Sequence, residues 1–309
     1  MKEYEITLTQ DDFKRLSRAK DNKDEIVRPS VSYWEDVFRR MVTNRVAVVS
    51  FTVIAIIAIL AIFIPIFSEF GYEKTDLMST NVSPNKTHWF GTDSVGRDLW
   101  SRLWVGARVS LIIGLGGAIV PQIIGIFLGG ISGYFGKWVD MLIMRIIDIG
   151  VCIPSLVYVT LIMLLLGSGP VSIIIAIAIT GWMDSARVVR GRMLQFKNRE
   201  FVLAAKTQGV SSIRIIFKHI LPNVLGQLVI NISSAIPAAI FLEAYLSFIG
   251  LGIQSPMTSW GQLSKTGSSF YRLYPYQLFI PGIFISVTIL AFYLFGNCLR
   301  DALDPHLRD

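Results

Sequence analysis

Long apolar runs separated by polar segments dominate the chain after its first 45 residues. Two of these runs, Val46–Phe67 and Leu278–Leu299, contain no charged side chain. A helix over either run would be about 33 Å long, enough to cross the roughly 30 Å hydrocarbon core of a bilayer. We therefore expect an all-α membrane protein. The pattern predicts six membrane-spanning helices, over Val46–Phe67, Val109–Ile131, Ile143–Leu166, Val171–Val189, Val224–Leu246 and Leu278–Leu299.

The composition agrees with this pattern. The chain has 309 residues, of which 52% are hydrophobic and 17% charged, whereas soluble domains carry about 25% charged residues. These values exclude a soluble enzyme, a disordered chain and a disulfide scaffold, and both cysteines, Cys152 and Cys298, fall inside apolar runs. A net charge of +7 is low for a nucleic-acid-binding protein of this size, so no nucleic-acid partner is expected.

The distribution of Lys and Arg between the loops predicts the orientation of the spans. With the amino terminus in the cytoplasm, the inside segments hold 20 basic residues and the outside segments seven. The positive-inside rule therefore places both termini in the cytoplasm. The expected divisions are a cytoplasmic tail over 1–45 with an interfacial helix from about residue 32, a first span over 46–67, an extracytoplasmic loop over 68–107, a core over 108–300 with five spans, and a cytoplasmic end over 301–309.

Glycines, prolines and a capping pattern predict where helices pack closely, begin or kink. Gly125, Gly129 and Gly133 recur every four residues in the second span, so their common face is expected to pack closely against a neighbouring helix. Ser32 and Glu35 form a capping-box pattern at the start of the interfacial helix. Prolines lie inside the third, fifth and sixth spans, where they can kink a helix: Pro154, Pro237 and Pro281.

Charged residues are rare inside the spans and therefore informative. Arg145 and Asp148 lie one helical turn apart in the third span, and they are expected either to form an ion pair or to line a solute path. Glu243 in the fifth span could likewise be a buried hydrogen-bond partner or line a path. The residues that could line a path in the fifth span are Asn231, Ser233, Ser234 and Glu243, although contacts between helices would explain them equally well.

No catalytic or metal-binding motif is present in the sequence. The three histidines, His88, His219 and His306, lie in separate segments without a spacing typical of metal ligands. Gly136-Lys137 lacks the remainder of a Walker phosphate-binding loop. We therefore expect neither a metal ion, nor a cofactor, nor a catalytic residue in this chain.

The loop over residues 190–223, called the basic loop below, has seven Lys or Arg residues, one acidic residue and several apolar ones. A helix from about Glu200 is expected to end at Gly209, since glycine adopts positive φ readily. A second helix would begin near Ser211 and stop before Pro222. A short basic helical pair with exposed apolar residues indicates a binding partner, or else packing against the inner membrane surface.

The basic loop resembles a known motif. Leu203-Ala204-Ala205 with Gly209, followed by Leu221-Pro222, is similar to the EAA loop of ABC-importer membrane subunits. Leu203 stands where many relatives have glutamate, and Glu200, one turn earlier, could substitute for that carboxylate.

Further segments narrow the resemblance to the C-type permease of oligopeptide and dipeptide importers. They cover most of the chain from about residue 32: Phe90–Asp98, Ser101-Arg102, Gly106–Leu111, Leu246–Gly252, Ser259–Gly261 and Leu299–Pro305.

The resemblance implies a type I ABC importer permease fold in the plasma membrane of a prokaryote. It implies a heterodimer with a second permease subunit, two cytoplasmic ATPase subunits that bind ATP and Mg, and an extracytoplasmic solute-binding protein. It also implies that Glu200, Leu203, Ala204, Ala205, Gly209, Leu221 and Pro222 couple the chain to an ATPase.

Two other functions remain open from the residues alone. The solute could be nickel or another small solute rather than a peptide, because related importers carry both kinds. An ion-coupled secondary carrier would instead use buried carboxylates such as Asp148 and Glu243.

Overall fold

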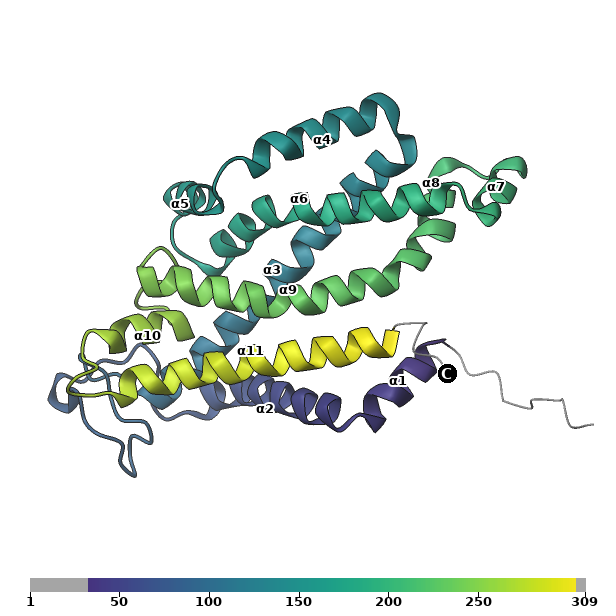
Figure 1. Cartoon of the computed structure of the whole chain (residues 1–309). Coiled ribbons are helices and arrows are strands. Elements are labelled where there is room, and N and C mark those ends of the chain that lie inside the picture. The colour runs from purple at the N-terminus through teal and green to yellow at the C-terminus, as the bar shows by residue number, and fades with distance from the viewer. Residues whose placement is uncertain (1–32, 304–309) are drawn as a thin grey trace, which may run out of the picture. The chain divides into compact units, whose positions relative to one another are not determined.

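The computed structural model describes residues 33–303, and this part of the chain is helical, with no β-strand (Figure 1). Within these described residues, five helices are long and apolar enough to cross a membrane. They are α2 (Arg45–Phe67), α3 (Leu99–Phe135), α6 (Pro170–Lys197), α9 (Leu221–Ile249) and α11 (Tyr276–Leu303). These five helices contain the predicted first, second, fourth, fifth and sixth spans.

The predicted third span is broken rather than continuous. It consists of α4 (Lys137–Val151) and α5 (Ser155–Leu166), whose axes are bent by 88° relative to each other. Pro154 immediately precedes α5, and its ring disfavours a helical conformation of the residue before it. If this bent pair counts as one span, the described residues contain six candidate spans.

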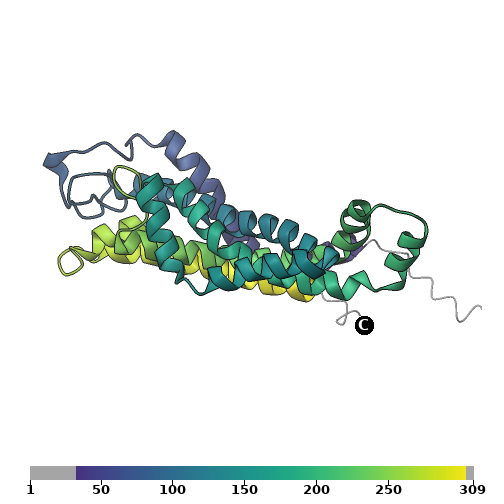
Figure 2. The same ribbon diagram turned by 90° about the horizontal axis from the view of Figure 1, so that it is seen from above.

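Helix α3 begins ten residues before the predicted span. The side chain of Asp98 caps it by accepting a hydrogen bond from the Ser101 amide at 2.8 Å. With 37 residues, α3 is about 55 Å long. It therefore reaches from the loop 68–98 at one end of the bundle to the basic loop at the other (Figure 2).

The glycine face of α3 packs against α6, which confirms the expectation of close helix packing. A Cβ atom on Gly129 would lie 2.9 Å from the Cα of Ala186, and one on Gly133 would lie 2.9 Å from the carbonyl oxygen of Arg190. Both distances are too short for a real Cβ atom. The two backbones therefore approach so closely that only glycine fits along this seam.

The amino-terminal helix α1 (Tyr33–Thr43) is present near the predicted position. Ser32, the expected cap, lies outside the described residues. On the inner face of α1, Val37 packs with Ala302 and Leu303 at the end of α11. Whether this helix lies in the membrane interface stays a prediction.

The largest hydrophobic core lies between α2, α3, α9, α11 and the short helix α10 (Trp260–Ser268). Half of the apolar window of α9 is buried, against 22% for α2 and for α11. Helix α9 is thus central, and α2 and α11 leave most of their apolar surface to lipid or to other subunits.

Candidate functional site

The basic loop forms a compact helical unit between α6 and α9. It contains α7 (Glu200–Thr207), α8 (Ser212–Arg214) and a π-helical turn, η3 (Ile215–Ile220), which runs directly into α9. Gly209 follows α7 with a φ of +76°, as the sequence predicted. The Val210 amide then bonds back to the Ala205 carbonyl oxygen at 3.1 Å, which closes the end of the helix.

The second predicted helix of the loop does not stop before Pro222. Pro222 lies instead in the first turn of α9, where its missing N–H removes no helical hydrogen bond. Ser211 precedes α8 without a side-chain cap. The loop is therefore continuous with a membrane-spanning helix, so a displacement of η3 acts directly on α9.

One face of α7 holds the unit together. Val202 and Ala205 are buried against Ile215, Ile216 and Ile220 of η3. This cluster also includes Val189 and Met193 of α6 and Tyr134 of α3. The α7 helix is thereby fixed to the ends of two long helices.

Several large apolar side chains of α7, α8 and η3 are exposed. Among them, Phe217 of η3 lies beside Phe127 of α3, with ring centroids 6.0 Å apart. The exposed fractions are 41% for Phe201, 48% for Leu203, 67% for Ile213 and 46% for Phe217. Large apolar side chains gathered on a surface mark a binding site more often than a scattered few do. Glu200 and Ala204 are exposed as well, whereas Ala205 belongs to the internal face.

Next to the basic loop, polar contacts join the last turns of α3 and the first turn of α4 to α6 and α7. Arg190 forms a bidentate ion pair with Asp140, with one N···O distance of 2.6 Å, and Ser132 donates a hydrogen bond to the same carboxylate at 2.5 Å. The Tyr134 ring lies 5.7 Å from Nζ of Lys197 and 5.5 Å from Nζ of Lys206. Sequence reasoning missed these contacts because they join residues that are far apart in the chain.

The predicted ion pair between Arg145 and Asp148 is replaced by another. Oδ1 of Asp148 lies 2.9 Å from Nη2 of Arg187 on α6. Both partners are largely open to their surroundings, with side-chain exposures of 56% and 42%. The pair ties α4 to α6 instead of two successive turns of α4.

Glu243 is fully buried and does not lie on an exposed face. Its carboxylate accepts hydrogen bonds from Ser110 of α3 and Ser247 of α9, both at 2.8 Å. Ser110 also accepts from the backbone N–H of Trp260. Of the two sequence interpretations, the structure favours the buried hydrogen-bond partner, which joins α3, α9 and α10.

The other residues proposed for a path divide between two environments. Asn231 is half-buried, and Ser234 is exposed on α9. Ser233 is buried, and its side chain lies where α9 meets Gly296 of α11. Asn231 accepts a hydrogen bond from Gln227 at 3.1 Å. Gln227, Asn231 and Ser234 follow one another at steps of four and three residues, so they form a polar stripe along one side of α9 that does not include Ser233.

A buried polar network at the opposite end of α3 was also missed. Arg102 is fully buried, donates to the carbonyl oxygen of Tyr72 at 2.9 Å, and reaches Gln262 of α10 at 3.2 Å. Arg97 pairs with Asp93 at 2.8 Å. Asp93, Arg97 and Arg102 lie in segments that the family resemblance covers, but only the folded structure shows that Arg102 fastens the loop 68–98 to α10.

No group of His, Cys, Asp and Glu residues suited to hold a metal ion occurs within residues 33–303.

Comparisons with known proteins agree with these features. Residues 125–309 match the family described as binding-protein-dependent transport system inner membrane component, and residues 32–84 match the N-terminal TM domain of oligopeptide transport permease C. The oligopeptide transport system permease protein OppC of Bacillus subtilis (strain 168) is 45% identical over 285 residues, covering 92% of this chain and 93% of that protein. The dipeptide transport system permease protein DppC of the same organism is 43% identical, covering 92% and 89%.

A solved structure shares the fold. A chain of the MetNI methionine ABC transporter, in inward facing conformations, aligns with a TM-score of 0.50 at 15% identity, covering 64% of this chain and 94% of that chain. The two chains therefore have a similar arrangement of helices. The chain described here belongs to the family of binding-protein-dependent transport system inner membrane components.

Proposed function

We propose that this chain is a permease subunit of an ATP-driven ABC importer of peptides and forms half of the translocation path. Membership of the family and the similarity to oligopeptide and dipeptide permeases over about nine-tenths of the chain support this function. The substrate is a short peptide, delivered by an extracytoplasmic solute-binding protein.

The complete importer contains further subunits. A second permease forms a heterodimer with this chain, and two cytoplasmic ATPase subunits bind ATP and Mg and carry out hydrolysis. This chain itself binds no cofactor and catalyses no reaction. It crosses the plasma membrane several times with both termini in the cytoplasm, an orientation supported by the excess of Lys and Arg in the basic loop and the tail.

The observation that carries the proposal is the exposed apolar surface of α7 and α8, called the docking face below, which consists of Phe201, Leu203 and Ile213. Full burial of a Leu or Phe side chain is worth about 1.5–3 kcal/mol, so each half-exposed residue on this face leaves about 1 kcal/mol to be gained in a complex. Phe201, Leu203 and Ile213 together suit a cleft in one ATPase subunit. The surrounding basic residues keep the face soluble until it docks.

Docking would couple hydrolysis to transport through packing. Val202 and Ala205 join α7 to η3, and η3 continues into α9. A movement of the ATPase pair that displaces α7 would therefore also displace α9, whose stripe with Asn231 and Ser234 lines the path. ATP must bind one arrangement of the helices more tightly than the other for this displacement to occur.

The experiment is purification of the complex from native membranes in mild detergent, followed by uptake assays in proteoliposomes. We expect a second permease, two ATPase chains and a solute-binding protein to copurify, and a labelled oligopeptide to enter only with ATP. A lone or homo-oligomeric chain whose uptake follows an ion gradient would contradict the proposal and favour a secondary carrier. A binding protein that retains nickel and no peptide would contradict the substrate.

A matched pair of variants tests the docking face. Leu203→Asp places a charge in the proposed interface, and we expect the ATPase subunits to be lost on purification. Leu273→Asp changes an even more exposed leucine, at 75% against 48%, in the loop after α10 at the opposite end of the bundle. We expect that variant to retain the ATPase subunits, and equal retention in both variants would exclude the face from docking.

A further inference from the structure

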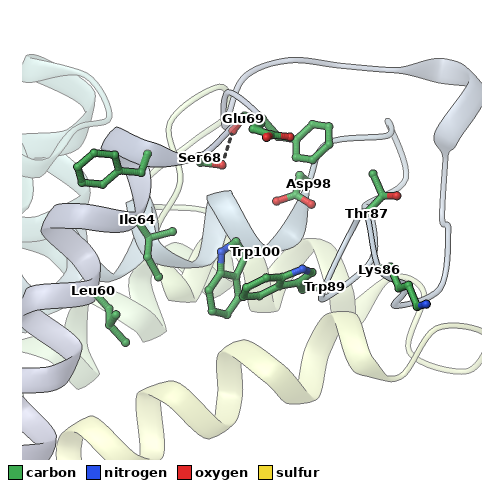
Figure 3. A pocket seen from close by; sticks show the side chains of 11 residues that line it. Leu60, Ile64, Ser68, Glu69, Lys86, Thr87, Trp89, Asp98 and Trp100 are labelled. Atoms are coloured by element: carbon green, nitrogen blue, oxygen red, sulfur yellow. Dashed lines mark hydrogen bonds between the residues drawn. The ribbon is translucent and has the colours of Figure 1, made fainter.

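A cavity of about 830 Å³ lies at the end of α2 that is farthest from the basic loop. It opens between the last turns of α2, the loop 68–98 and the first turn of α3 (Figure 3). Its volume is in the range of sites that bind small organic molecules, about 300–1,000 Å³. Neither the docking face nor the polar stripe of α9 contributes to it.

One wall of the cavity is apolar and belongs to the membrane-spanning helix. Leu60, Ile64 and Phe67 are spaced four and three residues apart, so they lie along one face of α2. On the adjacent face, Phe63 and Ile66 are exposed. The cavity wall is thus continuous with the apolar surface that α2 presents to the bilayer.

A second wall consists of indole rings. Trp89 and Trp100 lie side by side between the α2 side chains and Lys86, with ring centroids 4.9 Å apart (Figure 3). Trp89 is 61% exposed, which is high for a large aromatic side chain. Tryptophan is enriched at the level of lipid headgroups, where one side of the ring meets apolar chains and the other meets water.

The rim of the cavity carries two free charges of opposite sign. Glu69 and Lys86 are exposed, and neither forms an ion pair or a side-chain hydrogen bond with any of residues 33–303. Asp98 also reaches the cavity, but its carboxylate is engaged by His88 at 2.8 Å and by the amide at the start of α3. The hydroxyl group of Thr87 adds a neutral donor beside Lys86.

We propose that this cavity binds a phospholipid with a zwitterionic aminoalkyl phosphate headgroup, of the phosphatidylethanolamine class. One acyl chain lies along Leu60 and Ile64, and the phosphate is bound by Lys86 and Thr87. The ammonium group is bound by Glu69 and the exposed face of Trp89. Continuity with the lipid-facing surface of α2 favours a lipid over a protein segment. The presence of one charge of each sign without a partner in the described part of the chain, on Glu69 and Lys86, favours a zwitterionic over an anionic headgroup.

The test uses the whole purified complex in nanodiscs that contain a phospholipid with a photoreactive acyl chain. Separate preparations carry the ethanolamine, choline or glycerol headgroup, and the labelled peptides are mapped by mass spectrometry. We expect the ethanolamine lipid to label the segments around Leu60–Phe67 and Trp89–Trp100 most strongly. Lys86→Ala and Glu69→Gln should each reduce that labelling about fivefold, which corresponds to about 1 kcal/mol per charged contact at the membrane surface.

Lys74→Ala is the matched control, because Lys74 is an exposed lysine in the same loop that does not line the cavity. Lys86→Arg should keep most of the labelling, which separates a role in binding from a role in folding. Equal labelling by all three lipids, or stronger labelling by the glycerol headgroup, would overturn the proposal. Absence of lipid labelling, together with crosslinks from Trp89→Cys to the solute-binding protein, would overturn it in favour of a protein-docking surface.

Discussion

The turn after α7 is the most sensitive single point of the proposed coupling mechanism. Gly209 has a φ of +76°, which a β-branched residue adopts only with strain. A Cβ atom on Gly209 would meet no other atom within 4 Å, so substitution there causes no steric clash. The penalty of Gly209→Val is therefore conformational alone, about 1–2 kcal/mol for a left-handed backbone.

That penalty disfavours the turn with a left-handed residue 209 by about five- to thirtyfold relative to conformations in which residue 209 has a negative φ. The chain should still insert and assemble, because the buried face of α7 is unchanged. We expect the number of peptides imported per ATP hydrolysed to fall by up to that factor. The measurement is peptide uptake and phosphate release from the same proteoliposomes that contain the complete complex.

Two further variants isolate the cause. Gly191→Val introduces the same side chain into α6, where a Cβ atom also meets nothing within 4 Å but φ is not positive. We expect normal coupling in that variant. Gly209→Asn should have a smaller effect than Gly209→Val because asparagine tolerates the left-handed region. A wild-type ratio of uptake to hydrolysis in Gly209→Val, at an equal amount of assembled complex, would refute the role of the turn.

Six further substitutions test the helix packing and the polar contacts. Gly129→Leu should lower the melting temperature of the purified complex strongly, since a side chain would press into the backbone of α6, whereas Gly282→Leu on α11, with open space, should not. Glu243→Leu should destabilise by about 1–3 kcal/mol by leaving two buried serine hydroxyls without their acceptor, and Glu243→Gln should destabilise less. Asp140→Asn weakens a bidentate ion pair and should lower the stability of the fold by about 1 kcal/mol. Asp148→Asn weakens an exposed ion pair and should leave the stability almost unchanged. Equal melting temperatures of these two variants would contradict this ranking.

Local sequence signals predicted the helices of this fold well. Uninterrupted apolar runs predicted α2 and α11 nearly to their ends, because a span of that length has no other stable conformation in a bilayer. Gly209 was recognised as the end of α7 for an equally local reason, its freedom to adopt positive φ. The glycine face of α3 was predicted from spacing alone, since steps of four residues align on one side of a helix.

The two wrong predictions, a continuous third span and an ion pair of Asp148 with Arg145, both concern how helices are placed relative to one another. Apolar composition does not distinguish one straight span from two helices at 88°, so the break near Pro154 was read as a kink. Asp148 was paired with its neighbour in sequence because spacing along one helix says nothing of what the next helix presents. Arg187 lies 39 residues away and was therefore not considered as its partner.

At the candidate site, too, local features could be predicted from the sequence and tertiary contacts could not. The basic loop could be located from its charge and its motif, whereas the attachment of Tyr134 to Lys197 and Lys206 needed coordinates. Glu243 was correctly singled out as unusual, but only its burial decides between a path and a structural bond. The sequence thus identifies the basic loop and Glu243, and the tertiary fold shows which residues they contact.

The two ends of α3 differ in how they are held, and this difference has a consequence for transport. At the Leu99 end, buried Arg102 fastens the helix to α10 and to the loop before it. At the Phe135 end, Tyr134 packs in the apolar cluster with α6 and α7. Ser132 also donates a hydrogen bond to Asp140 of α4, which in turn pairs with Arg190 of α6. Between them, the glycine seam leaves no free volume for α3 to move independently of α6. A displacement of α7 should therefore tilt α3 and α6 together, about the firmly held end, rather than slide one past the other.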